Sequence, residues 1–199
     1  MTKLAEIFAR IPRHWLFAAA GLIQVALIAL MVADRIRILR TGSEVTLQTR
    51  PVDPRDFLRG DYVVLGYDIS SVPAGELKDT PTAGRGTILY VKLAPNADGF
   101  YQAVSVHRDP VAVATGEVLI RGRVIRGDNC GDDRRAFCSS LSLTYGIENF
   151  FVPQGEGREL EKARNERKIT VVAAVAPGGR AAIKRLLLDG KPVYDEPLF

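Results

Sequence analysis

The N-terminal part of the chain contains a long hydrophobic block. Residues 15–33 carry no charge, and Gln24 is the only strongly polar side chain among them. As a helix this block rises roughly 28 Å at about 1.5 Å per residue, close to the hydrocarbon thickness of a bilayer. Trp15 at its start suits the headgroup layer. A core helix would show a polar stripe and a signal peptide would end in small residues, so we expect an uncleaved membrane anchor.

After the hydrophobic block, apolar and polar residues alternate in short runs. In the first run, Val63, Leu65, Tyr67 and Ile69 occupy every second position. This period is typical of half-buried antiparallel strands. Such strands are expected at 63–69, 88–93, 104–107, 118–124 and 141–145, with a nearly continuous apolar strand at 169–176.

Turn residues separate these runs, and one charged segment interrupts them. Hairpin turns are expected at 96–99, 177–179 and 189–190, where Gly, Asn, Asp and Pro gather. Within 157–168, Leu160 and Ala163 lie three apart among charged residues, which predicts a short surface helix.

These elements predict a mainly β (α+β) fold with four successive parts. The domain should be one antiparallel β-barrel or β-sandwich with a short helix, preceded by the N-terminal transmembrane helix. The expected boundaries are a basic flank at 1–14, the anchor at 15–33, a juxtamembrane linker at 34–43 and the β-rich domain at 44–199.

The positive charge of the chain is concentrated beside the hydrophobic block. The sequence holds 27 Lys and Arg against 23 Asp and Glu, and the segment 1–40 contributes six of the former and two of the latter. Positive and negative side chains are therefore equal in number over 41–199, and this part is formally neutral. The distribution suits contact with anionic headgroups and gives no electrostatic reason to expect nucleic-acid binding.

The two cysteines bear on the orientation of the anchor. Three basic residues precede the hydrophobic block and three follow it, so the positive-inside rule does not decide the orientation. Cys130 and Cys138 flank a polar loop-like stretch, and such a pair fits one disulfide formed in an oxidising compartment. Two unpaired thiols are the alternative. We expect the disulfide, and hence a domain outside the cytoplasm.

Two sequence motifs carry a resemblance to a known family. Residues 60–67 read Gly-Asp-Tyr-x-x-Leu-x-Tyr, after an Asp-Pro-Arg-Asp lead-in, and residues 145–153 read Tyr-Gly-Ile-Glu-Asn-Phe-Phe-Val-Pro. Together with Gly-Arg-Ala-Ala-Ile at 179–183, they resemble the bacterial family named for its GDYXXLXY motif. The resemblance implies a membrane-anchored protein of no established activity, found alongside polytopic membrane proteins. It implies a class of partner and no reaction.

The first motif has a structural and a functional interpretation. Leu65 and Tyr67 should share the core face of one strand, Gly60 should permit the turn before it, and Asp61 should accept backbone N–H groups there. The functional interpretation would bring Arg59, Asp61 or Tyr62 together with Glu148 on one surface. We expect the structural role. Arg59-Gly60-Asp61 also spells a cell-adhesion tripeptide, which is too short to weigh.

The second motif includes a strongly apolar run. It consists of Phe150, Phe151, Val152 and Pro153, preceded by Tyr145, Gly146 and Glu148. In a loop this run would be a docking patch, and in a strand it would be core. We expect core, because such runs are more often buried.

Few catalytic chemistries fit the remaining residues. His14 and His107 are the only histidines, and the two cysteines lack the paired spacing of structural zinc, so no metal site and no cofactor are expected. No Gly-x-Ser-x-Gly elbow or phosphate-binding fingerprint occurs. One alternative is similar to membrane-anchored signal peptidases, with Ser43 as nucleophile and Lys92 as a desolvated general base. Glu44 after Ser43 and Leu93 after Lys92 depart from that pattern.

The leading hypothesis is a non-catalytic interaction module. It would be an accessory subunit of an integral membrane protein, anchored once in the bacterial inner membrane with its domain in the periplasm. Gln24 could hydrogen-bond a partner helix. The alternatives are the serine–lysine peptidase and a binder of a small molecule or lipid in the interior or mouth of the barrel.

Overall fold

The computed structural model describes residues 12–52, 62–73, 83–128, 140–151 and 157–197. By its internal contacts the chain divides into two compact units, Met1–Arg37 and Ile38–Phe199. The two units are described separately below.

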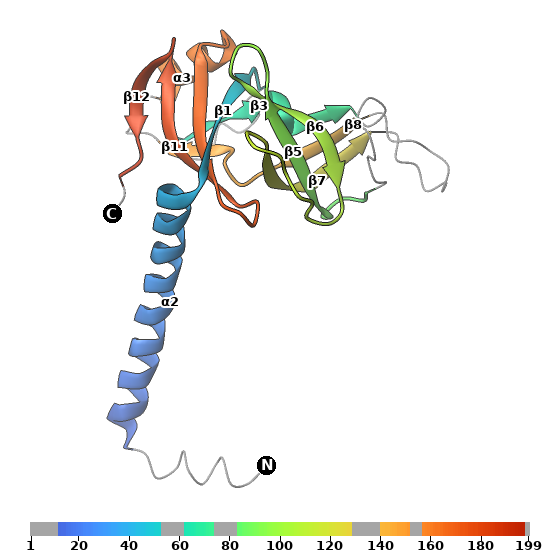
Figure 1. The fold of residues 1–199 in the computed structure, drawn as a ribbon. Helices are drawn as coiled ribbons and strands as arrows, with labels where there is room; N and C mark the ends of the chain where they lie inside the picture. The colour runs from blue at the N-terminus through green and yellow to red at the C-terminus, as the bar shows by residue number, and fades with distance from the viewer. Residues whose placement is uncertain (1–11, 53–61, 74–82, 129–139, 152–156, 198–199) are drawn as a thin grey trace. The chain divides into compact units, whose positions relative to one another are not determined.

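The described part of the first unit is a single apolar helix. Helix α2 spans Arg13–Thr41 (Figure 1), and in the described residues it is the one helix long and apolar enough to cross a membrane. Its side chains over 13–33 are exposed on every face, as Phe17 and Leu22 illustrate at 77% and 72% exposed. A helix that is apolar all round is consistent with a single-pass membrane anchor.

The last turn of helix α2 belongs to the second unit. Ile38 and Leu39 are buried against Ala174 and Ala182 of the domain. Within the juxtamembrane linker expected at 34–43, the helix continues to Thr41 and the first strand begins at Ser43. The apolar residues of this last turn pack against the domain.

A glycine makes this close packing possible. A Cβ atom added to Gly42 would lie 2.6 Å from the Ile38 carbonyl oxygen and 2.9 Å from the Val175 nitrogen. Both are backbone atoms that cannot move aside cheaply, so the passage from helix to strand requires glycine at this position.

The domain is mainly β, and its antiparallel sheets form a nearly closed, barrel-like arrangement, as expected. The first sheet has the strand order β12-β11-β10-β1-β3. Its strands are β1 (Ser43–Arg50), β3 (Gly66–Tyr67), β10 (Ile169–Val175), β11 (Ala181–Leu188) and β12 (Lys191–Asp195).

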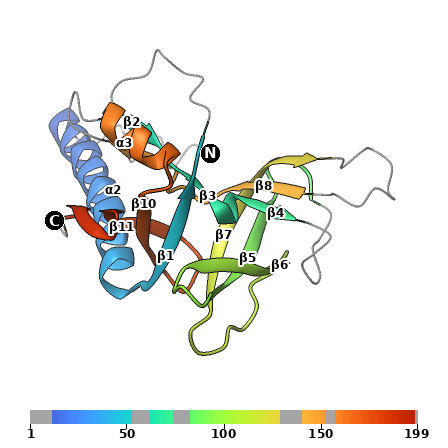
Figure 2. The same ribbon diagram turned by 90° about the horizontal axis from the view of Figure 1, so that it is seen from above.

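The second sheet has the order β4-β8-β7-β5-β6. Its strands are β4 (Ser71–Pro73), β5 (Ile88–Pro95), β6 (Tyr101–His107), β7 (Val118–Asp128) and β8 (Ser140–Thr144). Figure 2 shows β1 and β3 between the C-terminal strands and this second sheet. The core fills the space between the sheets, with Leu47, Leu89, Ile120 and Leu143 at most 1% exposed.

Three shorter elements complete the domain. A two-stranded ribbon pairs β2 (Tyr62–Val64) with β9 (Asn149–Phe151), and a 3-10 turn, η1, covers Asp68–Ser70. Helix α3 (Gly157–Asn165) packs on β1, β2 and β10. The turn after β10 joins the two sheets, because the Gly179 carbonyl accepts the Arg121 N–H of β7 at 2.7 Å.

Most expected elements are confirmed, and one is divided. The expected strands at 88–93, 104–107, 118–124, 141–145 and 169–176, the helix at 157–168 and the three turns correspond to structure. The strand expected at 63–69 is wrong as one strand, since Leu65 separates β2 from β3 and residues 68–70 form η1. The alternation is preserved, but the two halves pair with different partners.

Candidate functional site

The two sequence motifs lie side by side in the domain. Strand β2 pairs antiparallel with β9, so that Val63 faces Phe150 and Val64 faces Asn149. The pairing continues where the Leu65 N–H donates to the Glu148 carbonyl at 2.7 Å. Residues 62–67 and 145–151, which we call the motif junction, therefore form one unit although they lie far apart in the chain.

Two tyrosines fasten the motif junction from both sides. The Tyr67 hydroxyl donates to the Ile147 carbonyl at 2.5 Å, and the Tyr145 hydroxyl donates to the Ile69 carbonyl at 2.6 Å. Each tyrosine thus reaches from its own motif to the backbone beside the other. Burial, together with the nearby Glu148 carboxylate, raises the pKa of both phenols far above the usual 10, so they remain neutral donors.

A glycine in a neighbouring strand accommodates one of these rings. A Cβ atom added to Gly122 of β7 would lie only 2.9 Å from the Tyr145 ring. The strand therefore needs a residue without a side chain at this position for Tyr145 to reach Ile69.

Glu148 organises the turn that carries the second motif. Its two carboxylate oxygens accept the backbone N–H groups of Tyr145, at 2.5 Å, and Gly146, at 2.9 Å. Gly146 has a φ of 81°, in the left-handed region that favours glycine. The Glu148 carboxylate is thus bound to its own turn, as a structural role requires.

A buried arginine connects helix α3 to the motif junction. Arg164 is fully buried, and its guanidinium donates to the Val64 carbonyl at 2.5 Å and to the Val52 carbonyl at 3.0 Å. A further bond joins Nη2 to the Asn165 side chain at 2.9 Å. Desolvation lowers the pKa of Arg164, which the nearby Glu161 partly offsets. Arg164 thereby fixes the chain on both sides of residues 53–61.

The role of Arg164 was not predicted from the sequence. The segment 157–168 was expected to be a surface helix with Leu160 and Ala163 as its apolar positions, because arginine is almost never fully buried unless it is paired. Its position in the sequence could have indicated burial, because Arg164 follows Leu160 by four residues and so lies on the same face of the helix.

The two adjacent phenylalanines of the second motif have opposite environments. Phe150 is buried, and its ring meets Tyr194 edge-on with centroids 4.8 Å apart. Phe151 is 78% exposed. The expectation that this run is core is confirmed for Phe150 and wrong for Phe151, because successive strand residues point to opposite faces. Val152 and Pro153 lie outside the described residues.

Several other predicted residues also lie outside the described part. These are Arg59, Gly60 and Asp61 of the first motif and the two cysteines, Cys130 and Cys138. Tyr62 is described through its backbone, which pairs with Phe151. Leu65 and Tyr67 are at most 1% exposed, which confirms their expected place in the core.

The contacts of Ser43 and Lys92 do not bring these two residues together as the proposed serine–lysine pair. Ser43 is exposed in β1 opposite Val175, in the first sheet. Lys92 lies in β5 of the second sheet, and its ammonium group is 3.2 Å from the Glu117 carboxylate. Lys92 therefore binds Glu117 and lies in a different sheet from Ser43, and this geometry does not support a serine–lysine dyad.

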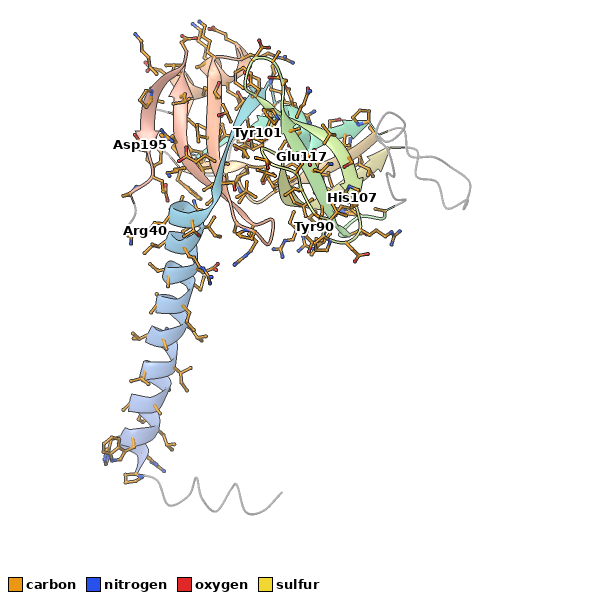
Figure 3. The ribbon with its side chains drawn as sticks, in the orientation of Figure 1. Arg40, Tyr90, Tyr101, His107, Glu117 and Asp195 are labelled. Carbon is orange, nitrogen blue, oxygen red and sulfur yellow. The ribbon has the colours of Figure 1, made fainter. Side chains whose placement is uncertain are left out.

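Lys92 instead borders a small cleft of about 390 Å³ whose lining includes Ser105, His107 and Glu117. His107 and Glu117 are labelled in Figure 3. Ser105 Oγ lies 2.8 Å from His107 Nε2. Sequence analysis missed this pair, although residues two apart in a strand share a face. A nucleophile must reach its substrate, but Ser105 is only 8% exposed.

The carboxylate in this cleft is also occupied. Glu117 accepts the Ala114 N–H at 2.9 Å, and this bond, together with Lys92, lowers the pKa of Glu117. Glu117 therefore remains an anion committed to Ala114 and Lys92, and this geometry does not build a catalytic triad around His107. In the part of the chain that the structure describes, no group of acidic, histidine or cysteine residues could hold a metal ion.

Comparison with known proteins identifies a matching family. The family model described as GDYXXLXY protein matches residues 24–186, which include both motifs and most of the domain. No curated protein and no solved structure matches the chain.

Proposed function

The chain belongs to the GDYXXLXY protein family, and from this membership and the motif junction we propose that it is a membrane-anchored, non-catalytic interaction module. It would serve as an accessory subunit of an integral membrane protein. Its anchor would be helix α2, placed once through the bacterial inner membrane as an uncleaved signal anchor, with the domain in the periplasm.

Phe151 is the observation that supports this proposal most directly. It is as exposed as Phe17 in the apolar helix, at 78% against 77%. Leaving a phenylalanine in water forgoes about 1.5–3 kcal/mol of burial free energy. Exposed aromatic residues on a rigid support are frequent anchors of protein interfaces.

The motif junction supplies that rigid support. Phe150 is fixed in the core beside Tyr194, and the backbone of Phe151 pairs with Tyr62. The tyrosine and Glu148 hydrogen bonds described above hold the turn that leads into β9. The motif residues therefore have a structural purpose, which is to fix the backbone that presents Phe151 and so limit the backbone entropy lost on binding.

The two alternative functions receive less support. Ser43 and Lys92 lie in different sheets, and Lys92 binds Glu117. In the described part of the domain, side chains such as Leu89 and Leu143 fill the space between the sheets, which counts against a ligand in the barrel interior.

Site-specific photocrosslinking from position 151 tests the proposal. A photoreactive phenylalanine analogue would replace Phe151 in the full-length protein in its native membrane. We expect a light-dependent adduct with one integral membrane protein, identified by mass spectrometry. Phe151→Ser should lose copurification of that protein while circular dichroism stays unchanged, because the side chain is exposed.

Val113 provides the matched control. It is also an exposed apolar residue, at 42%, and lies in the segment between β6 and β7. The analogue at position 113 should give no such adduct, and Val113→Ser should retain copurification. Equal crosslinking from both positions, or no adduct with a membrane protein from position 151, would refute the proposal.

A further inference from the structure

A second cleft, of about 460 Å³, lies where five elements of the domain meet. Three arginines line it: Arg50 at the end of β1, Arg85 in the turn before β5, and Arg126 in β7. Ser70 of η1 and Ser142 of β8 also border it. No Asp or Glu occurs among its lining residues, so its charge is strongly positive in the part of the chain that the structure describes.

Among the described residues, no acidic side chain neutralises the three guanidinium groups. None of the three forms an ion pair there, whereas Arg185 is bound to Glu44 and Asp195. Placing three like charges around one cleft costs free energy unless an anion compensates them. The arrangement resembles a recognition site more than a structural ion-pair network.

Ser70 supplies an independent observation. The residue is only 8% exposed, and its Oγ has no hydrogen-bond partner in the described structure. A buried hydroxyl without a partner destabilises the folded state, and such groups are rare in folded proteins. A hydroxyl at the edge of this cleft is a ready donor for an oxyanion.

The backbone around the cleft is well fixed. A β-bulge places the extra residue Ile125 between Val124 and Arg126, and it sets Arg126 opposite Ser142. Bulges commonly redirect side chains beside functional sites. The turn that carries Arg85 is held to β7 by bonds of 2.7 Å from Gly86 N–H to the Val124 carbonyl and 2.9 Å from Val124 N–H to the Thr87 carbonyl.

We propose that this cleft binds a phosphate group, carried by a small molecule or by a lipid headgroup. Guanidinium groups match the geometry and charge of phosphate through paired N–H donors. Three of them suit a group that carries more than one negative charge. The volume fits a small ligand, and the side chain of Ile125, which is 46% exposed, offers an apolar surface to its organic part. This function is independent of the interface at Phe151.

Isothermal titration of the full-length protein in neutral detergent tests the site. The probes are inorganic phosphate, pyrophosphate and soluble dihexanoyl phosphatidic acid. We expect binding that weakens with added salt, and at least about a tenfold loss of affinity in Arg126→Gln, because a charge-assisted contact is removed. Binding of phosphate or pyrophosphate indicates a small-molecule ligand, and binding confined to phosphatidic acid indicates a lipid headgroup.

Arg121→Gln is the matched control. It removes the same charge from an exposed position in the same strand, outside the cleft lining, and should leave affinity unchanged. Ser70→Ala should weaken binding several-fold without lowering the thermal unfolding temperature, because it removes an unsatisfied hydroxyl. Failure of all three probes to bind, or equal losses in Arg126→Gln and Arg121→Gln, would overturn the proposal.

Discussion

Tyr67 and Tyr145 show how single residues of the two motifs act. Each phenol is buried and donates to a backbone carbonyl beside the other motif, that of Ile147 or Ile69. Replacing either phenol by phenylalanine removes one donor and leaves a carbonyl without its partner, which typically costs about 1–2 kcal/mol. The hydrogen bond of the hydroxyl, in addition to the packing of the ring, therefore explains why these positions are tyrosine and not phenylalanine.

The same two phenols predict a dependence of stability on pH. In the unfolded chain a tyrosine loses its proton near pH 10, but burial raises the pKa in the folded domain. The stability that each phenol contributes is fully present below pH 10 and declines as the pH rises above it. Above pH 10, each buried phenol makes the free energy of unfolding fall by about 1.4 kcal/mol more per pH unit.

Tyr145→Phe measures this contribution. Urea unfolding of the full-length protein in detergent, followed by circular dichroism, gives the free energy of unfolding at pH 8, 10 and 11. We expect the variant to be less stable at pH 8, and its stability to fall less steeply than wild type above pH 10. Identical slopes in the two proteins would show that Tyr145 titrates normally in the folded state.

At the residue scale, the sequence predicted which side chains are buried better than it predicted which residues they contact. The alternation around Leu65 and Tyr67 placed both in the core, since every second strand residue faces the same side. It could not show that Tyr67 bonds Ile147, because that contact joins positions distant in the chain. Arg50, Arg85 and Arg126 were missed for the same reason, as their cleft exists only after β1, β7 and the turn before β5 come together.

At the scale of elements, helix α3 acts through one buried residue. Arg164 lies at the C-terminal end of the helix and bonds the carbonyls of Val52 and Val64. These carbonyls lie on either side of residues 53–61, which carry the start of the first motif. Helix α3 therefore holds a motif that lies far before it in the chain.

Arg164→Met should separate this helix from the motif junction. The substitution keeps a long apolar side chain but leaves two carbonyls without donors, and we expect a loss of about 2–4 kcal/mol in the free energy of unfolding. Lys162→Met, at an exposed position of the same helix, should change it by less than about 0.5 kcal/mol. Equal effects in urea unfolding would mean that Arg164 contributes nothing beyond its position in the helix.

Element boundaries were harder to predict than element types. Alternation identified strands well, but β1 was not predicted, because only Val45 and Leu47 of its buried face are apolar and the third buried residue is Thr49; all three are at most 1% exposed. The run at 63–69 was divided because β2 pairs with β9 while β3 pairs with β1. Pairing partners are non-local, so periodicity alone could not place that break.

At the scale of the whole molecule, the charge distribution and the hydrophobic block indicate which interactions would hold the protein at a membrane and which would select its partner. The surplus of basic residues lies within the segment 1–40, and the segment 41–199 is formally neutral. Basic residues near the ends of an apolar helix favour contact with anionic headgroups. A neutral domain has no strong electrostatic preference, so its partner should be chosen by contacts such as that of Phe151 and not by long-range attraction.

The cysteine pair gives a test of the compartment in which the domain lies. Cys130 and Cys138, outside the described residues, should form a disulfide if the domain is in the periplasm. In freshly lysed cells, wild-type protein should then resist labelling by a maleimide polymer until reductant is added, and two thiols should react afterwards. Cys130→Ser leaves one thiol and should be labelled once without reductant. Two labels on unreduced wild type would contradict the periplasmic placement, because a loop of this length would gain about 2.5 kcal/mol from the bond and an oxidising compartment would form it.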